Sequence, residues 1–258
     1  YGKKFWADEY RLNERIANYK KPFVAFMQGF TMGGGVGVSC HGSHRIVGET
    51  SKIAMPECSI GLVPDVGGSF LLAKLPGNIG IFLGVTGKRM KASDAIFCGF
   101  ADHFIPETKW KDLKKKLIET GNIDWIKKFH ERTEISAIEN SFSQISEAMV
   151  DISSKNIESR LKHPSFEKDL SALRFNSPIS VAYTIIMLKM EKVRNNISDA
   201  LDTEYSFTAR SQEFGDFQEG IRATVIDKDR NPLWKHKSLD AVSEEDLQPF
   251  FRTMIGRA

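Results

Sequence analysis

A glycine-rich turn is the sequence feature that most constrains this chain. Gly33–Gly35 are three consecutive glycines, and Gly37 follows after a single valine. The turn comes after Phe23–Met27, a short apolar run typical of a buried strand, and it predicts a helix start over 33–41. Such a turn exposes backbone N–H groups at the positive end of the helix dipole. It therefore favours an anion, either a phosphate or the oxyanion of a tetrahedral intermediate; close helix–strand packing that only glycine permits is an equal alternative.

The turn matches neither of two familiar phosphate-binding motifs. Gly33-x-Gly35 lacks the third glycine of a dinucleotide-binding fingerprint. No Gly-Lys-Ser/Thr follows, so the turn is not a P-loop. The turn alone leaves its ligand open.

Strands and helices alternate in the first part of the chain, and this order is typical of an α/β fold. We predict strands at 23–27, 45–47, 52–55 and 101–105, an amphipathic helix at 3–20 and short helices at 68–75, 78–86 and 92–99. After residue 106 the pattern predicts helices only, at 107–119, 123–131, 135–150, 155–161, 165–174, 178–193 and about 197–213. The chain is thus expected to divide into an α/β core, 1–106, and a helical region, 107–258.

Two carboxylates follow the glycine turn in loops that proline stiffens. Pro56 precedes Glu57, and Pro64 precedes Asp65. Their neighbours in the sequence are mostly apolar, and an apolar setting raises the pKa of a carboxyl group towards the range of a general base. The alternative is that each carboxylate is simply solvated, as most carboxylates in surface loops are. For Asp65, capping of a helix that starts at the following glycine pair is a further alternative.

Histidine and cysteine residues do not predict a metal site or a disulfide framework. His41 and His44 have a spacing compatible with two ligands on one helix face, but no third ligand is evident. Cys40, Cys58 and Cys98 are an odd number with no metal-type spacing, which fits core residues in a reducing compartment.

Charge and hydropathy exclude two classes of partner. The 258 residues carry 36 basic and 33 acidic side chains, a net charge of +3 that is too balanced to favour nucleic acid. No apolar run approaches the roughly 18–20 residues of a membrane span, and no signal peptide is evident. The chain begins at Tyr1 rather than Met, so a signal at the start of the gene would lie outside it.

The motifs resemble those of the crotonase (enoyl-CoA hydratase/isomerase) superfamily, and within it the 3-hydroxyisobutyryl-CoA hydrolases most of all. The resemblance is carried by Gly33–Gly37, by Met55–Glu57 and by Pro64–Gly68. It extends from Phe5 to the C-terminus and includes Asp8–Asn13, Thr31–Gly37, Leu83–Gly87, Phe217–Ala223 and Ile226–Asp229. Taken by itself, Phe217–Ala223 predicts either a simple helix end or a segment that packs over an active site.

The resemblance implies a spiral of ββα turns, with a C-terminal helical region that usually forms trimers. It implies that the backbone N–H of Gly34 is one of two donors to the thioester oxygen, that Glu57 is a catalytic glutamate shared with hydratases, and that Asp65 is a second acid characteristic of the hydrolases. The implied substrate-binding residues are Met32, Gly33, Gly35, Pro64 and Gly67. Hydratases carry another glutamate where this chain has Val36 or Gly37, which argues against simple hydration.

The implied reaction is hydrolysis of a short β-hydroxyacyl-CoA, 3-hydroxyisobutyryl-CoA above all, to free acid and CoA in valine degradation. Coenzyme A would enter only as part of this small-molecule substrate, with no other cofactor and no metal. The alternatives are an enoyl-CoA hydratase or isomerase and a non-catalytic crotonase-like subunit of a larger assembly. We expect a bacterial cytoplasmic protein, or a mitochondrial matrix protein if the source is eukaryotic.

The resemblance also implies residues upstream of this chain. In the superfamily that region holds the first strands of the spiral and a loop that gives the other oxyanion donor, and it contributes contacts to CoA. We therefore expect the sequence to be an incomplete record or a fragment.

Overall fold

Parallel strand pairing organises the first part of the computed structural model, which describes residues 2–252. Strands β1 (Val24–Met27), β3 (His44–Val47) and β5 (His103–Phe104) form one sheet in the order β1-β3-β5, and β2 (Phe30–Met32) pairs with β4 (Lys52–Ala54) in a second. Two successive strands, β1 and β2, are followed by the helix α2 (Gly34–Ser39), and the next two strands each pair in parallel with one of the first two. The chain thus winds as stacked ββα turns, and the expected α/β class is confirmed.

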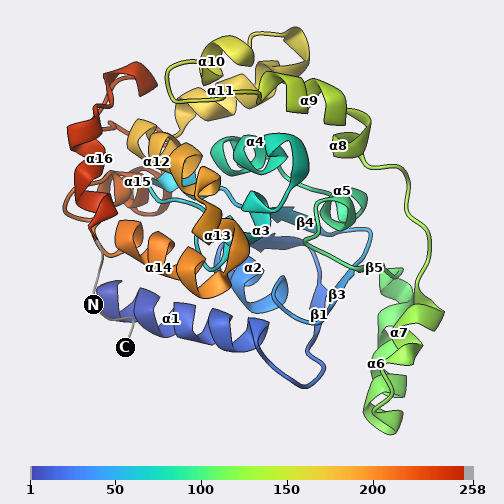
Figure 1. The fold of residues 1–258 in the computed structure, drawn as a ribbon. Helices are drawn as coiled ribbons and strands as arrows, with labels where there is room; N and C mark the ends of the chain where they lie inside the picture. Colours follow the sequence, from blue (N-terminus) through green and yellow to red (C-terminus); the bar gives the residue numbers. More distant parts are fainter. Residues whose placement is uncertain (1, 253–258) are drawn as a thin grey trace.

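Helices cover these turns and make up most of the remaining chain (Figure 1). The α-helices are α1 Gly2–Ala17, α3 Gly68–Ala73, α4 Ile79–Thr86, α5 Ala92–Phe97, α6 Trp110–Thr120, α7 Asp124–Phe129, α8 Ala137–Asn140, α9 Phe142–Ala148, α10 Ile157–Arg160, α11 Glu167–Phe175, α12 Pro178–Lys189, α13 Glu191–Asn195, α14 Ile197–Thr208, α15 Phe217–Ile221 and α16 Glu244–Phe251. Short 3-10 segments are η1 Glu57–Ile60, η2 Pro76–Asn78, η3 Glu107–Lys109, η4 Pro164–Phe166 and η6 Leu239–Ala241, and η5, Arg222–Ile226, is a π-helix. None of the helices within 2–252 is both long enough and apolar enough to cross a bilayer.

Several expected helices are broken or shorter in the structure, three of them markedly. The expected helix 178–193 divides at Met190, whose extended backbone (φ −71°, ψ 126°) ends α12 and lets α13 pack on α3. The expected helix 135–150 divides at Ser141, and the one expected over 197–213 ends at Thr208. Tertiary packing overrides the helical pattern at these points, because a short helix follows the surface beneath it more closely than a long one.

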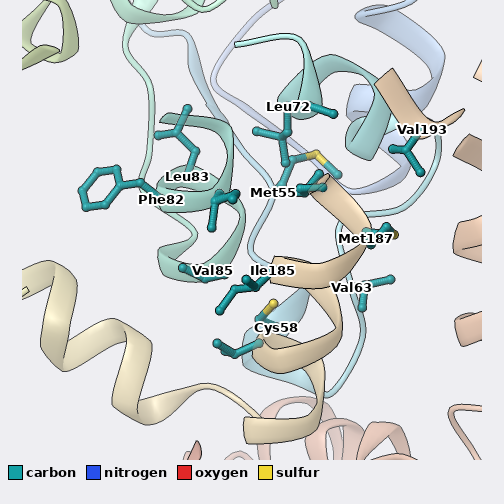
Figure 2. Packing of buried hydrophobic residues seen from close by; sticks show 14 of the residues in the cluster. Met55, Cys58, Val63, Leu72, Phe82, Leu83, Val85, Ile185, Met187 and Val193 are labelled. Atoms are coloured by element: carbon teal, nitrogen blue, oxygen red, sulfur yellow. The ribbon is translucent and has the colours of Figure 1, made fainter. Parts of the chain in front are cut away.

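A continuous apolar core joins the two parts of the chain (Figure 2). Met55, Cys58 and Val63 belong to the same buried cluster as Ile185 and Met187 of α12. Burial of each large apolar side chain contributes about 1.5–3 kcal/mol, so this contact is a major source of stability. All three cysteines are free and buried, as expected. The division at residue 106 stays a prediction.

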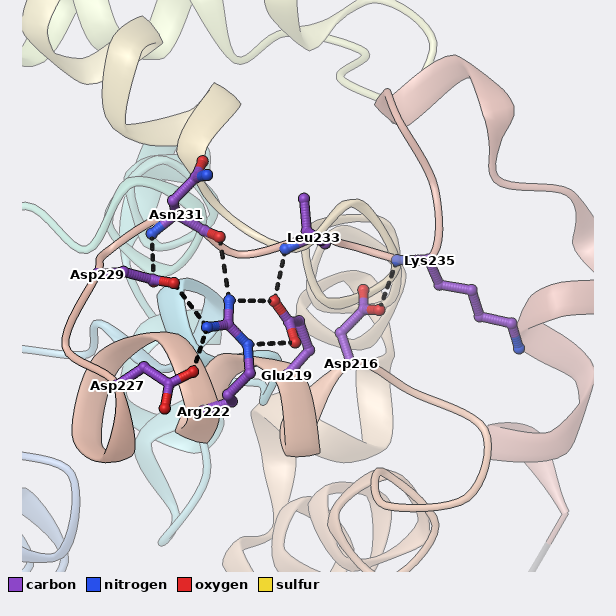
Figure 3. A network of polar contacts seen from close by, with 8 residues as sticks. All are labelled: Asp216, Glu219, Arg222, Asp227, Asp229, Asn231, Leu233 and Lys235. Atoms are coloured by element: carbon purple, nitrogen blue, oxygen red, sulfur yellow. Dashed lines mark hydrogen bonds and ion pairs between the residues drawn. The ribbon is translucent and has the colours of Figure 1, made fainter.

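The segment after α14 folds against η1, the 3-10 helix that opens with Glu57. Arg222 bonds to Glu219 of α15 and to Asp227 and Asp229 of the following loop, which ties the loop back onto α15 (Figure 3). At Gly220 a Cβ atom would lie 2.2 Å from the carbonyl oxygen of Ile60, so α15 contacts the backbone of η1 directly. The segment thus packs against η1, and whether it also covers an active site stays a prediction.

This contact predicts that Gly220→Ala destabilises the protein by about 1–3 kcal/mol, since the added methyl group must displace backbone. Chemical denaturation measures the loss. Gly35→Ala is the control: it is helical, and its Cβ would meet only the Thr31 methyl group at 3.6 Å, so no loss is expected. Equal stability of Gly220→Ala and the original protein would contradict the close contact.

Candidate active site

The glycine turn lies directly beside the Glu57 carboxyl group. Gly33 caps α2 with φ 51°, and a Cβ atom on it would lie 3.5 Å from Glu57 Oε1. Gly34 and Gly35 begin the helix, where backbone N–H groups have no intrahelical acceptor. Gly34 is exposed in the described part of the chain. The structure thus brings the predicted oxyanion donor and the predicted catalytic glutamate together.

Glu57 is buried rather than solvated. It opens η1 after Pro56, and its side chain is 5% exposed. The backbone N–H groups of Gly33 and of Glu57 itself lower the pKa of this carboxyl group, while Oε2 has no hydrogen-bond partner within 2–252. Burial, and next the charge of Asp65, raise the pKa of Glu57 well above its usual value. The expectation that both carboxylates lie in loops is therefore wrong for Glu57, which is part of a helix.

Asp65 is equally buried, at 5% exposure, and holds a specific partner. The Tyr10 hydroxyl donates to Asp65 Oδ2 over 2.7 Å. Burial raises the pKa of Asp65 to about 7, although the hydrogen bond from Tyr10 opposes the shift. The capping alternative is wrong, because Gly67 caps α3 without any side-chain hydrogen bond. Asp65 is therefore a second carboxyl group that titrates near neutral pH.

One face of α1 supplies three residues that sequence reasoning did not select. Glu9, Tyr10 and Asn13 are spaced to share a helix face. Glu9 Oε1 would lie 2.9 Å from a Cβ atom on Gly34, so its carboxyl group overhangs the glycine turn. Burial raises the pKa of Glu9 as well. The signal was present in the Asp8–Asn13 motif, but nothing in its spacing indicated which residues turn towards the site.

Asn13 fills the space beside Gly37. A Cβ atom on Gly37 would lie 2.6 Å from Asn13 Nδ2 and 2.7 Å from the Cβ atom of Val66. Asn13 is fully buried, and neither its amide nitrogen nor its amide oxygen has a partner within the described residues. Val36 is buried in the apolar core. No larger side chain fits at Gly37 without displacing Asn13 or Val66.

His41 supports the backbone next to Asp65. Its Nε2 atom lies 2.8 Å from the carbonyl oxygen of Val66, which only accepts, so Nε2 carries the proton. Burial lowers the pKa of His41, so the ring is neutral in this contact. Among residues 2–252 no cluster of three or more metal-ligating side chains occurs.

The remaining predicted substrate-binding residues border the same carboxyl pair. Met32 ends β2 directly before the glycine turn, and Pro64 is buried directly before Asp65. Gly67 follows Val66 with φ 78°, and a Cβ atom there would lie 2.5 Å from His41 Nε2. Their contact with substrate stays a prediction.

Glu204 is a fourth acidic residue at this place, and it comes from the distant helix α14. Its carboxyl group is fully buried and accepts hydrogen bonds from Gly67 N (2.8 Å) and Ser69 N (3.1 Å). Burial raises the pKa of Glu204 to about 8. It is 139 residues from Asp65 in the sequence, so no local pattern could have identified it.

Comparison with known proteins places this geometry in a family. A family model described as enoyl-CoA hydratase/isomerase matches residues 1–251. The mitochondrial 3-hydroxyisobutyryl-CoA hydrolases of Gallus gallus and Homo sapiens are 37% and 35% identical to this chain, over 97% of its length and 68% of theirs. The chain therefore belongs to the enoyl-CoA hydratase/isomerase family, the crotonase superfamily, as the resemblance implied.

Solved structures agree on the fold. An enoyl-CoA hydratase from Rhodobacter sphaeroides matches with a TM-score of 0.92 and 46% identity, over 98% of this chain and 74% of that one. A carnitinyl-CoA dehydratase from Mycobacterium thermoresistibile also gives a TM-score of 0.92, with 34% identity over 98% and 74%. The crotonase-like fold with its helical region is confirmed, and the chain is that of a crotonase-superfamily enzyme.

The raised pKa values of Asp65 and Glu204 predict that the protein loses stability as pH rises. Both groups stay protonated in the folded protein when the unfolded chain already ionises them, so unfolding releases protons. The effect begins above about pH 4 and continues to the folded values of about 7 and 8. In Asp65→Asn the free energy of unfolding should fall less steeply between pH 4 and 7, by up to about 1.4 kcal/mol per pH unit.

Urea denaturation at several pH values measures this slope. Asp8→Asn is the matched control, because Asp8 is exposed and its pKa is lowered by Lys4 and Arg11, so it titrates below the window. A slope that Asp65→Asn leaves unchanged would mean that Asp65 ionises normally in the folded protein.

Proposed function

We propose that this chain hydrolyses the thioester of a short β-hydroxyacyl-CoA, 3-hydroxyisobutyryl-CoA being the foremost candidate. The observation that carries the proposal is the buried pair of carboxyl groups, Glu57 and Asp65, beside the Gly33–Gly35 turn. The names of the relatives from Gallus gallus and Homo sapiens, both 3-hydroxyisobutyryl-CoA hydrolases, support the substrate. Coenzyme A enters as part of the substrate, and the proposed chemistry uses no other cofactor.

In the proposed reaction the thioester oxygen lies against the N–H of Gly34, a donor worth roughly 3–4 kcal/mol of barrier. Glu57 attacks the carbonyl carbon to form an anhydride, or removes a proton from the attacking water. The sulfur of CoA leaves as a thiolate and takes a proton from Asp65. On the anhydride route a water molecule then cleaves the anhydride, which releases the free acid and restores Glu57, and the proton of this water returns to Asp65. On the direct route the proton that Glu57 took from water passes to Asp65. Met32, Gly33, Gly35, Pro64 and Gly67 would line the acyl group around this centre.

This chemistry needs charge on Glu57 and a proton on Asp65. Two neighbouring carboxyl groups do not both ionise readily, so one proton stays on the pair near neutral pH. Burial and the charge of Asp65 raise the pKa of Glu57 more than the N–H groups of Gly33 and Glu57 lower it, and the Tyr10 hydroxyl favours the charge on Asp65. In the free protein the shared proton therefore stays on Glu57, and the proposed reaction needs it to pass to Asp65 when the substrate binds. A role in orienting the substrate hydroxyl group is an alternative for Asp65.

Hydration of an enoyl-CoA is the second candidate, favoured by the name of the 46% identical hydratase structure. The resemblance assigns hydratases another glutamate at the positions of Val36 or Gly37. Here Val36 is buried among apolar side chains, and Asn13 with Val66 fills the space beside Gly37. A second acid has no room at either position, which supports hydrolysis.

Glu57→Gln tests the proposal. It should lower the rate of CoA release from 3-hydroxyisobutyryl-CoA by about 10²–10⁴-fold, because an amide neither attacks the carbonyl carbon nor accepts a proton. Binding of the CoA ester should persist, since glutamine has nearly the same shape. Thiol detection on the whole protein measures the rate, and calorimetry measures binding; turnover like that of the unchanged protein would sink the assignment.

The unchanged protein separates the rival functions in the same experiment. Loss of enoyl absorbance from crotonyl-CoA without thiol release would favour the hydratase. Neither activity would favour a non-catalytic subunit. The Asp8→Asn variant controls for non-specific loss, because Asp8 is exposed and, among residues 2–252, its side chain pairs with Lys4 and Arg11 of its own helix.

Two further proposals follow from family membership. A homo-oligomer, a trimer by analogy with the superfamily, is proposed for the assembly. The mitochondrial names of the curated relatives support the matrix if the source is eukaryotic, and the bacterial cytoplasm stays our prediction otherwise.

A further inference from the structure

The turn after Asp65 has a strained backbone. Asp65–Gly68 closes with a hydrogen bond from Gly68 N to Asp65 O over 2.7 Å. Val66 has φ 54° and Gly67 has φ 78°. A β-branched residue rarely adopts positive φ, and such strain costs about 1–3 kcal/mol. Contacts from outside the turn must therefore hold it.

Glu204 supplies the largest set of these contacts. Its Oε2 accepts from Gly67 N, and its Oε1 accepts from Ser69 N and from the Ser69 hydroxyl. The two N–H groups lie at the start of α3, where a helix offers them no acceptor. One carboxyl group thus satisfies three buried donors and fixes both sides of Gly67.

The same helix reaches Asp65 by a second route. Thr208, one turn after Glu204 on α14, lies 3.2 Å from the Tyr10 hydroxyl, which donates to Asp65. Figure 1 shows α14 running beside α1, the helix that carries Tyr10. Helix α14 therefore contacts the backbone that carries Asp65 and the partner of its side chain.

We propose that Glu204 is a positioning residue for Asp65, holding the strained turn so that the Asp65 carboxyl group faces Tyr10 and Glu57. This inference rests on the proposed function for its effect on turnover. It goes beyond that function because Glu204 acts through the turn and not on the substrate.

The charge of Glu204 predicts an effect on the pKa of Glu57, which a residue that only supported the fold would not have. The titratable groups that interact with it are Asp65, Glu57, Tyr10 of α1 and Tyr183 of α12, and His41 lies on the other side of the turn. Above its own pKa of about 8, where Glu204 is ionised, its negative charge contributes to the raised pKa of Glu57. Removing the charge should therefore lower that pKa.

Glu204→Gln tests the proposal in the whole protein. It keeps the shape but loses the charge and at least one of the three hydrogen bonds. We expect kcat to fall roughly 10-fold to 100-fold with KM nearly unchanged, because Asp65 is misplaced after substrate binds. The acid limb of the kcat/KM profile should move to lower pH.

Two variants separate these effects. Ser69→Ala removes one hydrogen bond and keeps the charge, so a smaller fall in kcat with an unmoved pH profile is expected; it also serves if Glu204→Gln does not fold. Asp169→Asn is the matched control, a buried carboxyl group paired with Lys88 over 2.8 Å at a different place. It should cost stability and leave the profile unmoved.

Amide hydrogen exchange provides a readout that needs no activity. The N–H groups of Gly67 and Ser69 should exchange faster in Glu204→Gln than in the unchanged protein, and not in Asp169→Asn. Unchanged exchange together with an unmoved pH profile would overturn the role of Glu204. Absence of thioester cleavage in the unchanged protein would overturn the proposed function instead, while the exchange experiment would still decide about Glu204.

Discussion

Burial of several carboxyl groups at one place is the constraint on which the rest of this structure depends. Glu57, Asp65 and Glu204 are each at most 5% exposed, and their interactions with one another are repulsive when charged. A buried charge costs several kcal/mol unless hydrogen bonds or protonation offset it. Here backbone N–H groups, a tyrosine hydroxyl and bound protons offset the cost of burial. The apolar core around Met55 and Ile185 stabilises the fold enough to tolerate the cost that remains.

Glycine determines how closely the backbone approaches these groups. At Gly33 and Gly34 a side chain would meet the carboxyl groups of Glu57 and Glu9, and at Gly37 it would meet Asn13. Close packing is thus observed at the glycine turn, and ligand binding there stays a prediction. Packing brings the acidic side chains onto the turn, and the same bare backbone leaves N–H groups beside them.

The sequence predicted the central part of the site because its residues lie close together along the chain. Glu57, Asp65 and Gly34 fall within a short stretch whose prolines and glycines indicate a stiff backbone. In the structure Glu57 interacts with Asp65 and lies beside Gly33, the residue before Gly34. It could not predict burial by distant elements. Glu204 is selected only when α14 packs on α3, and the break at Met190 arises from the same packing rather than from local propensity.

The position of Glu204 also bears on the predicted division at residue 106. A hydrogen bond from Gly67 to Glu204 joins the two regions at the turn that carries Asp65, and Ser177 N donates to Cys58 O beside Glu57. The helical region thus completes the surroundings of both acids. Without α14, the α/β part would leave buried N–H donors at the start of α3 without acceptors. Each unsatisfied donor would cost about 1–3 kcal/mol of stability. The strained Val66 would then relax, and with it the direction of Asp65.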